Sequence, residues 1–153
     1  MTKPDDQVPI ENIEKKLRYI AGAIKLNGRK ILNNYPITSP QFAALQWLID
    51  DENLTIGELS KKIGLAFSTT TDLVDRMENN ALVKRVRDEK DRRVVRIQVE
   101  DKGKVIIKEV IKKRQAYLGE VLASFSMEDS LTLNTMLSDL YEQMKIKQHQ
   151  ENN

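Results

Sequence analysis

The chain has 153 residues, of which 40% are hydrophobic and 31% charged, and its formal net charge is +2 at pH 7. Because it contains no cysteine and one histidine, His149, it lacks the residues for thiol chemistry, Ser-His-Asp catalysis and Cys- or His-ligated metal sites. No apolar run approaches the roughly 20 residues that span a bilayer, and residues 1–9 carry no apolar signal segment. We therefore expect a cytoplasmic protein without membrane contact, cofactor, metal or enzymatic activity.

The first two helices are predicted from apolar spacing and from capping residues. Apolar residues at helical intervals indicate a long helix over residues 10–35, which ends there because a residue that precedes a proline, here Pro36, avoids helical backbone angles. A second helix is predicted to begin near Thr38, whose side chain can form a capping box with Gln41, and to stop near residue 50.

A short third helix and a fourth helix follow, separated by a tight turn. Thr55 and Glu58 can form a second capping box, and Gly64 is a natural left-handed end for the third helix. The fourth helix is predicted from about Phe67 to Asn79. Its spacing turns Thr70, Leu73, Val74 and Met77 inward and leaves outside Ser68, Thr69, Thr71, Asp72, Asp75 and Arg76.

The hydrophobic period then changes from 3.6 to 2, which predicts a β-hairpin. Its strands comprise residues 83–87 and 95–99, and its tip comprises residues 88–93. Two further helices are predicted, one from Asp101 and one from Ser126. Since no repeat, linker or clear boundary interrupts the chain, we expect one mainly α-helical domain over residues 1–153, with about six helices and a hairpin.

The basic residues are concentrated in the hairpin. Residues 83–96 contain seven basic side chains and three acidic ones, whereas residues 1–54 and 101–153 each contain equal numbers of both. A phosphate-binding surface needs such a local excess of positive charge, but a solvated hairpin tip would have the same composition.

The order of these elements is typical of a winged helix-turn-helix. A helix fits the major groove of B-DNA, and its first turns meet the base edges. The hydroxyls of Ser68, Thr69 and Thr71 are short enough to let the helix approach and can bond bases or phosphates. The hairpin tip can then reach an adjacent minor groove, where narrow A·T stretches attract arginine. Taken alone, the threonines are equally well explained as surface residues of an ordinary helix.

The N- and C-terminal helices carry broader apolar stripes than a small DNA-binding lobe can cover. We expect a homodimer in which these helices pack together, with the two recognition helices about one DNA turn, roughly 34 Å, apart. A monomeric bundle in which the helices fold back is the alternative. The residues assigned to dimerisation are Ile13, Leu17, Val121, Leu122, Leu133, Leu137 and Leu140.

Residues 54–104 read LTIGELSKKIGLAFSTTTDLVDRMENNALVKRVRDEKDRRVVRIQVEDKGK. They contain a Ser-Thr pair that opens the recognition helix, a Leu-Val-Asp-Arg run, a Leu-Val-x-Arg entry to the wing, and Asp-Arg-Arg at the tip. With the flanking helices, this pattern resembles the MarR family of bacterial transcriptional regulators over nearly the whole chain. The resemblance implies a DNA-binding lobe over residues 38–100 and dimerisation helices over residues 10–35 and 101–147.

The resemblance also implies roles for individual residues. Arg93 would enter the minor groove, Asp91 would hold Arg93 by an ion pair, and Arg92 would contact a neighbouring phosphate. The paired recognition helices would read a pseudo-palindromic operator in double-stranded DNA. The full set of expected DNA contacts is Ser68, Thr69, Thr71, Arg76, Lys84, Arg85, Lys90, Asp91, Arg92 and Arg93.

Three positions depart from the family pattern. Asp72 stands where a basic residue is frequent, and it would repel phosphate, accept from a cytosine amino group or pair with Arg76. Ala81 stands where a glycine is usual, so a left-handed cap is expected at Asn79 or Asn80 instead. Val99-Glu100 replaces the usual Leu-Thr before the fifth helix.

The leading hypothesis is a dimeric, sequence-specific DNA-binding repressor that a small apolar or aromatic ligand releases from DNA. By resemblance, such a ligand would lie near Tyr19, Phe42, Trp47 and Tyr117, although core packing is the favoured explanation of these aromatic residues. The absence of cysteine and of clustered histidines argues against the thiol-oxidation and zinc-responsive branches of the family. The alternative function is a protein-binding adaptor whose basic tip engages an acidic surface.

Overall fold

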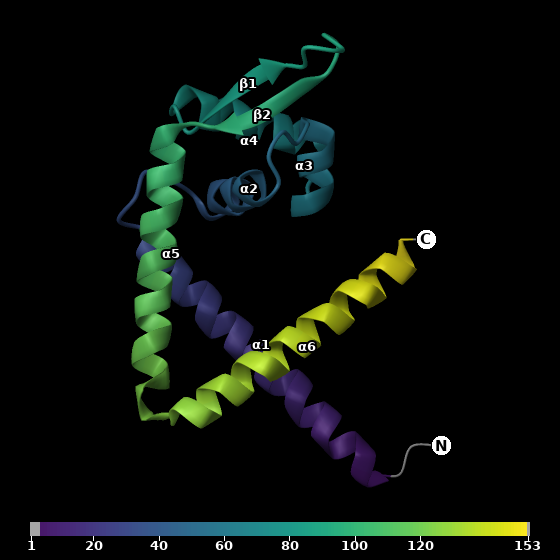
Figure 1. Ribbon diagram of the computed structural model, residues 1–153, viewed down its shortest axis with the longest axis vertical. Coiled ribbons are helices and arrows are strands. Elements are labelled where there is room, and N and C mark those ends of the chain that lie inside the picture. The colour runs from purple at the N-terminus through teal and green to yellow at the C-terminus, as the bar shows by residue number, and fades with distance from the viewer. Residues whose placement is uncertain (1–3, 153) are drawn as a thin grey trace. The chain divides into compact units, whose positions relative to one another are not determined.

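The computed structural model describes residues 4–152, which contain six α-helices and one β-hairpin (Figure 1). No helix in this part of the chain is long and apolar enough to cross a membrane. The mainly α-helical winged helix-turn-helix fold predicted from the sequence is confirmed. In chain order, the elements are α1 (Pro4–Leu32), α2 (Ser39–Asp50), α3 (Ile56–Ile63), α4 (Phe67–Asn79), β1 (Val83–Arg87), β2 (Val95–Val99), α5 (Asp101–Val121), a 3-10 turn (Leu122–Ser124) and α6 (Met127–Glu151).

The chain divides into two compact units, of which the first ends at Arg114 and the second begins at Gln115. The hydrophobic core lies in the first unit, where α2, α3, α4, the antiparallel hairpin and the first part of α5 pack together. In the second unit, α6 contains no buried residue. The largest side chains that are fully buried in the core are Leu45, Leu59, Met77, Leu82 and Ile97.

The predicted capping boxes set the starts of α2 and α3. The Thr38 hydroxyl accepts from the Gln41 backbone N–H at 3.3 Å, and the Gln41 side chain accepts from the Thr38 N–H at 3.0 Å. Thr55 and Glu58 make the corresponding bonds at 3.1 and 3.3 Å. Gly64 ends α3 with a left-handed φ of 70°, as expected. These bonds satisfy amides that have no partner within the first helical turn.

The chain leaves α4 through a left-handed Ala81, so the expectation that Asn79 or Asn80 would take this conformation is wrong. Ala81 has a φ of 61°, whereas Asn80 has a φ of −91°. The N–H groups of Ala81 and Leu82 donate to carbonyls in the last turn of α4 at 3.0 and 2.9 Å, which is the Schellman pattern. Because Leu82 is fully buried directly after this turn, the chain must reverse at the residue before it.

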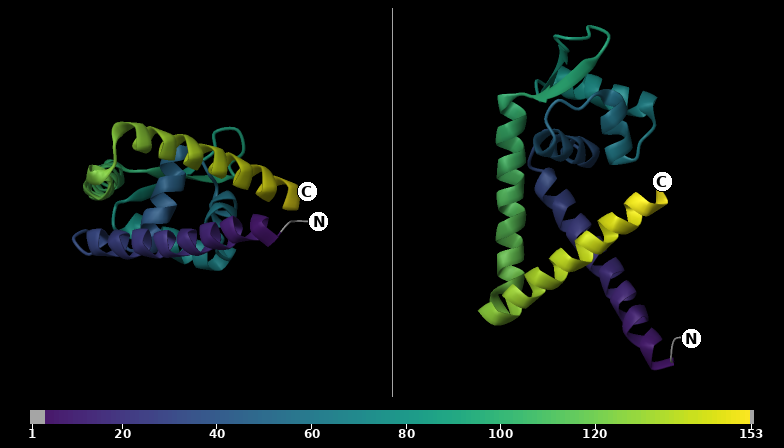
Figure 2. Two further views of the ribbon diagram at one scale, coloured as in Figure 1. Left: turned by 90° about the horizontal axis from the view of Figure 1, so that it is seen from below. Right: turned by 45° about the vertical axis from the view of Figure 1, so that its right-hand side comes forward.

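The base of the hairpin is attached to the rest of the first unit on two sides. The Ile97 N–H donates to the Leu54 carbonyl at 2.8 Å, and Thr55 forms a β-bridge with Arg96. At the start of α5, Gly103 approaches the Leu82 carbonyl so closely that a Cβ atom would lie 2.5 Å from the oxygen. The base is therefore held in place, while the tip of the hairpin projects beyond α2, α3 and α4 (Figure 2).

Replacing Ala81 with glycine is expected to stabilise the protein by about 0.5–1 kcal/mol. A left-handed residue with a Cβ costs about 1–2 kcal/mol, and the greater freedom of glycine in the unfolded chain offsets part of the gain. Urea unfolding at one protein concentration measures the free energy of unfolding. Ala43→Gly in the interior of α2 is the matched control and should destabilise the protein by about 0.5–1 kcal/mol. An unchanged or lower stability of Ala81→Gly would contradict the assigned role of the turn.

Candidate nucleic-acid interface

The outer face of α4 presents small polar side chains. Ser68 and Thr69 are exposed in its first turn, and within residues 4–152 neither hydroxyl has a hydrogen-bond partner. Thr70 is buried, as its predicted inward position requires. The half-buried Thr71 donates its hydroxyl proton to the Phe67 carbonyl at 3.0 Å. Ser68 and Thr69 are therefore the hydroxyls of this helix that are free to donate to a ligand.

Two charged residues lie exposed one helical turn apart on α4. Asp72 and Arg76 could have paired at this spacing, but no such ion pair forms in the described part of the chain. Arg76 instead lines an open pocket together with Asn79, Asn80 and the loop at residues 36–38. Both charges are consequently available to an external partner.

The side chain of Arg85 in β1 is bound to α4. Its guanidinium lies 2.6 Å from the Asp75 carboxylate and 2.7 Å from that of Glu78, and its backbone N–H donates to Glu78 at 2.9 Å. Partial burial acts to lower the pKa of Arg85, but the hydrogen bonds and charges of the two carboxylates outweigh burial and raise this pKa. Arg85, which the sequence places among the expected DNA contacts, thus joins the wing to α4.

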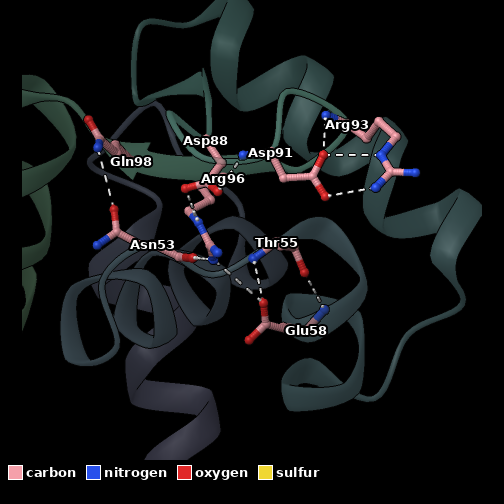
Figure 3. A network of polar contacts seen from close by, with 8 residues as sticks. All are labelled: Asn53, Thr55, Glu58, Asp88, Asp91, Arg93, Arg96 and Gln98. Carbon is pink, nitrogen blue, oxygen red and sulfur yellow. Dashed lines mark hydrogen bonds and ion pairs between the residues drawn. The ribbon is translucent and has the colours of Figure 1, made fainter.

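The wing tip is a closed loop that holds Arg93 at its surface (Figure 3). The Asp88 N–H donates to the Val94 carbonyl at 2.9 Å, and the Val94 N–H donates to the Asp91 carbonyl at 3.0 Å. The Asp91 carboxylate accepts bonds from the side chain of Arg93 at 3.1 and 3.3 Å and from its backbone N–H at 3.1 Å. These bonds lower the pKa of Asp91. The expected ion pair is present, and the Arg93 side chain remains 91% exposed.

The other basic residues of the hairpin divide between the tip and the strands. Lys90 and Arg92 are exposed at the tip, where the Arg92 carbonyl accepts a bond from the Arg87 guanidinium at 2.9 Å. Lys84 is exposed on β1 and lies 4.0 Å from Glu100. Since this distance is at the limit of an ion pair and both side chains are accessible, Lys84 is only weakly held.

A network that the sequence did not reveal joins the wing tip to the segment before α3 (Figure 3). Arg96 of β2 donates to the Asn53 carbonyl at 2.8 Å and lies 3.5 Å from the Asp88 carboxylate. Asp88 also accepts a bond from the Asp91 backbone N–H at 3.1 Å. The ion pair of Asp88 and Arg96 could have been predicted from the sequence, because these opposite charges lie on the two facing arms of the predicted hairpin. Asn53, which is 43 residues from Arg96, gave no such signal.

Phe42, one of the four aromatic residues considered for a ligand pocket, lines a cavity of about 440 Å³ among α1, α2 and α5. The other three do not line this cavity. Trp47 packs half-buried against the core, with the Lys62 ammonium 5.1 Å from its ring. Tyr19 is exposed on α1, and Tyr117 is half-buried in the second unit. Core packing therefore accounts for Trp47 in the first unit.

The residues assigned to dimerisation are not buried within the chain. Ile13, Val121 and Leu137 are exposed. The remaining four, Leu17, Leu122, Leu133 and Leu140, are half-buried. Further large apolar residues are exposed along the same helices: Ile10, Ile20, Ile24 and Leu26 on α1, and Leu131, Met136, Tyr141, Met144 and Ile146 on α6. Each of the two helices thus carries large apolar side chains that lie outside the hydrophobic core.

Replacing Arg85 with alanine should destabilise the first unit by about 1–2 kcal/mol, because two carboxylates lose a half-buried partner. Lys84→Ala, the adjacent charge deletion, is the matched control and should change the free energy of unfolding by less than about 0.5 kcal/mol. Thermal and urea unfolding of the two variants test the difference. Equal stabilities would show that the contacts of Arg85 with α4 contribute nothing beyond surface charge.

Comparison with known proteins supports this reading of the fold. The model of the MarR family matches residues 37–95. The uncharacterized HTH-type transcriptional regulator YsmB of Bacillus subtilis (strain 168) is 54% identical over 138 residues, which are 90% of this chain and 94% of YsmB. The solved structure of a MarR family protein from Bacillus stearothermophilus is 55% identical, with a TM-score of 0.87 over 91% of this chain and 97% of that one.

A more distant structure, Streptococcus pneumoniae FabT in complex with DNA, shares the fold at 21% identity, with a TM-score of 0.75 over 89% of this chain and 97% of FabT. The high identity of YsmB and of the Bacillus stearothermophilus protein extends over both units, well beyond the winged lobe. The chain therefore belongs to the MarR family of transcriptional regulators.

Proposed function

We propose that the protein is a dimeric repressor that inserts α4 into the major groove of a pseudo-palindromic operator and Arg93 into the adjacent minor groove. The observation that carries the proposal is the geometry of the wing tip. There a nearly fully exposed guanidinium is oriented by a carboxylate that lies in the same loop. An exposed arginine on a narrow projection suits a minor groove, where the negative potential is concentrated. The FabT structure, solved with DNA, supports the use of this fold for DNA binding.

Contacts of different kinds follow from the positions of the side chains. Ser68 and Thr69 have free hydroxyls in the first turn of α4, which is the part of a recognition helix that meets base edges. Lys90 and Arg92 are exposed beside Arg93 and suit phosphates of the backbone. The charge of Asp72 opposes phosphate contact, so we assign this residue to a cytosine amino group. Arg85 is left out of the proposed contacts because its guanidinium is half-buried and binds two carboxylates, those of Asp75 and Glu78.

The proposed dimer forms through the apolar surfaces of α1 and α6, with α5 contributing near its end. Burying exposed apolar surface stabilises an assembly by about 25 cal/mol per Å², and these helices carry most of the exposed large apolar side chains. A two-fold dimer presents its two recognition helices to successive major grooves, which requires a spacing of roughly 34 Å and a pseudo-palindromic site. Sedimentation of the purified chain distinguishes this dimer from a monomeric bundle.

We also propose that a small ligand with an apolar body and one negative charge binds in the cavity between α1, α2 and α5 and releases the protein from DNA. Apolar walls from Ile24, Phe42 and Val110 stand beside the cationic side chains of Lys25, Arg29 and Arg114. The Arg114 guanidinium lies 5.7 Å from the centre of the Phe42 ring, so the charge and the apolar surface are adjacent. Such a lining favours a ligand with an apolar body and one negative charge.

The DNA-binding proposal is tested by selecting genomic fragments on the purified protein and footprinting the selected DNA at several salt concentrations. We expect a protected, pseudo-palindromic site and an affinity that falls steeply with salt, because phosphate contacts release counterions. The absence of any protected site would support the alternative from the sequence, a protein-binding adaptor.

On the selected operator, Arg93→Ala should weaken binding by about 1–3 kcal/mol while leaving the sedimentation of the dimer unchanged. Lys90→Ala is the matched control at the same tip. It should lower the affinity slightly and equally for all sequences, with a change in the salt slope of less than about one unit. Wild-type affinity of Arg93→Ala would mean that the wing does not enter the groove.

Benzoate should bind to the protein about tenfold more tightly than the neutral benzyl alcohol, because a hydrogen bond to a charged group contributes about 1.5–3 kcal/mol. It should also compete with operator binding at constant ionic strength. Arg114→Gln should remove the preference for the anion without changing the DNA affinity of the free protein. Equal affinities for benzoate and benzyl alcohol would contradict the proposal that the cavity binds an anionic ligand.

A further inference from the structure

We infer that Asp88 and Arg96 are positioning residues that hold the wing tip at the height and angle from which Arg93 reaches the minor groove. This inference rests on the proposed DNA-binding function. Asp88 and Arg96 themselves make no proposed contact with DNA. Their role is to hold the tip in position, and it does not depend on the net positive charge of the hairpin.

The Arg96 side chain ties the wing to the helical part of the first unit. Its guanidinium donates to the Asn53 carbonyl at 2.8 Å and lies 4.0 Å from the Glu58 carboxylate in the first turn of α3. Asn53 is held in a left-handed conformation with a φ of 71°, and its side chain accepts a bond from Gln98 at 3.4 Å. Arg96 is therefore fixed to backbone that belongs to the helix-turn-helix.

Asp88 continues the connection from Arg96 to the tip. One carboxylate oxygen lies 3.5 Å from the Arg96 guanidinium, and the other accepts the backbone N–H of Asp91 at 3.1 Å. Asp91 in turn binds the guanidinium of Arg93. Figure 3 shows these side chains in sequence from Asn53 to Arg93. Between Arg96 and Asp91 the connection passes through Asp88 alone, so the loss of either Asp88 or Arg96 breaks this side-chain link between the tip and the segment before α3.

The middle of this connection is less accessible than its end. The side chains of Asp88 and Arg96 are 26% and 34% exposed, whereas that of Arg93 is 91% exposed. Ion pairs that are partly shielded from water hold their geometry better than fully exposed ones. The core holds only the base of the hairpin, and a two-stranded ribbon beyond it has little stability of its own. The network of Asn53, Arg96, Asp88 and Asp91 thus limits the motion of the tip that carries Arg93.

Simple electrostatics and positioning predict opposite signs for the loss of Asp88. Removing an acidic side chain close to DNA strengthens binding if only charge matters, because the repulsion of phosphate is reduced. Removing it weakens binding if Asp88 orients the tip. Glu89 is the neighbouring acid, is exposed, and forms no hydrogen bond or ion pair within the part of the chain that the structure describes, so it provides the matched control.

The experiment measures operator dissociation constants for Asp88→Ala and Glu89→Ala at one salt concentration. Asp88→Ala should weaken binding by about five- to tenfold, the usual size of a coupling between contacting residues, and Glu89→Ala should leave it unchanged or tighten it. In the Arg93→Ala background, Asp88→Ala should cause no further loss. Asp88→Asn keeps an acceptor for Asp91 and serves if the alanine variant folds poorly, with a smaller loss in the same direction.

The base preference of the Asp88→Ala variant provides a second measurement, which a loss of protein stability alone would not change. Fragments selected by Asp88→Ala should lose the A·T preference at the flanks, where the wing meets DNA, and keep the bases read by α4. Tighter binding by Asp88→Ala, or an equal loss with and without Arg93, would overturn the inference while the DNA-binding function stands. Failure of the wild-type chain to retain any DNA fragment overturns both.

Discussion

Burial of the hairpin base against α2, α3 and α4 is the constraint on which the geometry of the interface depends. Leu82, Val83 and Ile97 have exposed fractions of 0%, 1% and 0%, and each buried side chain of this size stabilises the fold by about 1.5–3 kcal/mol. Since Leu82 enters the core directly after α4, Ala81 adopts a left-handed conformation in place of a glycine. The same burial brings Arg85 beside the acidic residues of α4. The wing and the recognition helix consequently form one structural element.

Six of the basic residues of the hairpin fall into two groups of three by the contacts that they make. Arg85, Arg87 and Arg96 make contacts within the protein, to carboxylates or to backbone carbonyls, and they fix the shape of the wing. Lys90, Arg92 and Arg93 are exposed at the tip and carry the proposed contacts with DNA. The acidic residues divide in the same way, because Asp88 and Asp91 accept bonds that define the loop, whereas Glu89 is exposed. A count of charges therefore describes this surface poorly.

The apolar residues outside the core are the basis of the proposed dimer. In the second unit, α6 has no buried residue, and the proposed dimer would cover its exposed apolar side chains. The cavity in the first unit is bordered by α1, α2 and α5, of which α2 also belongs to the helix-turn-helix lobe. A ligand that moves α2 relative to α1 would therefore alter the position of α4, which gives the proposed effector a physical route to the DNA-binding surface.

Local sequence signals predicted the order and type of the six α-helices and of the two strands, because capping boxes, helical spacing and the change to strand period act over neighbouring residues. They did not predict the 3-10 turn at Leu122–Ser124, and they extended the first helix to residue 35, whereas α1 ends at Leu32. Thr38, Thr55 and Gly64 act on neighbouring backbone, so their roles were readable without the fold. The ion pair of Asp91 and Arg93 also spans two residues and was predicted from the motif.

Tertiary structure decided the rest. It placed the left-handed turn at Ala81, paired the side chain of Arg85 with Asp75 and Glu78 of α4, and connected Asp88 through Arg96 to Asn53. These features depend on residues that are distant in the chain or on the point where a side chain enters the core. Such long-range contacts leave no periodic or local pattern in the sequence, and only the packed fold brings their partners together.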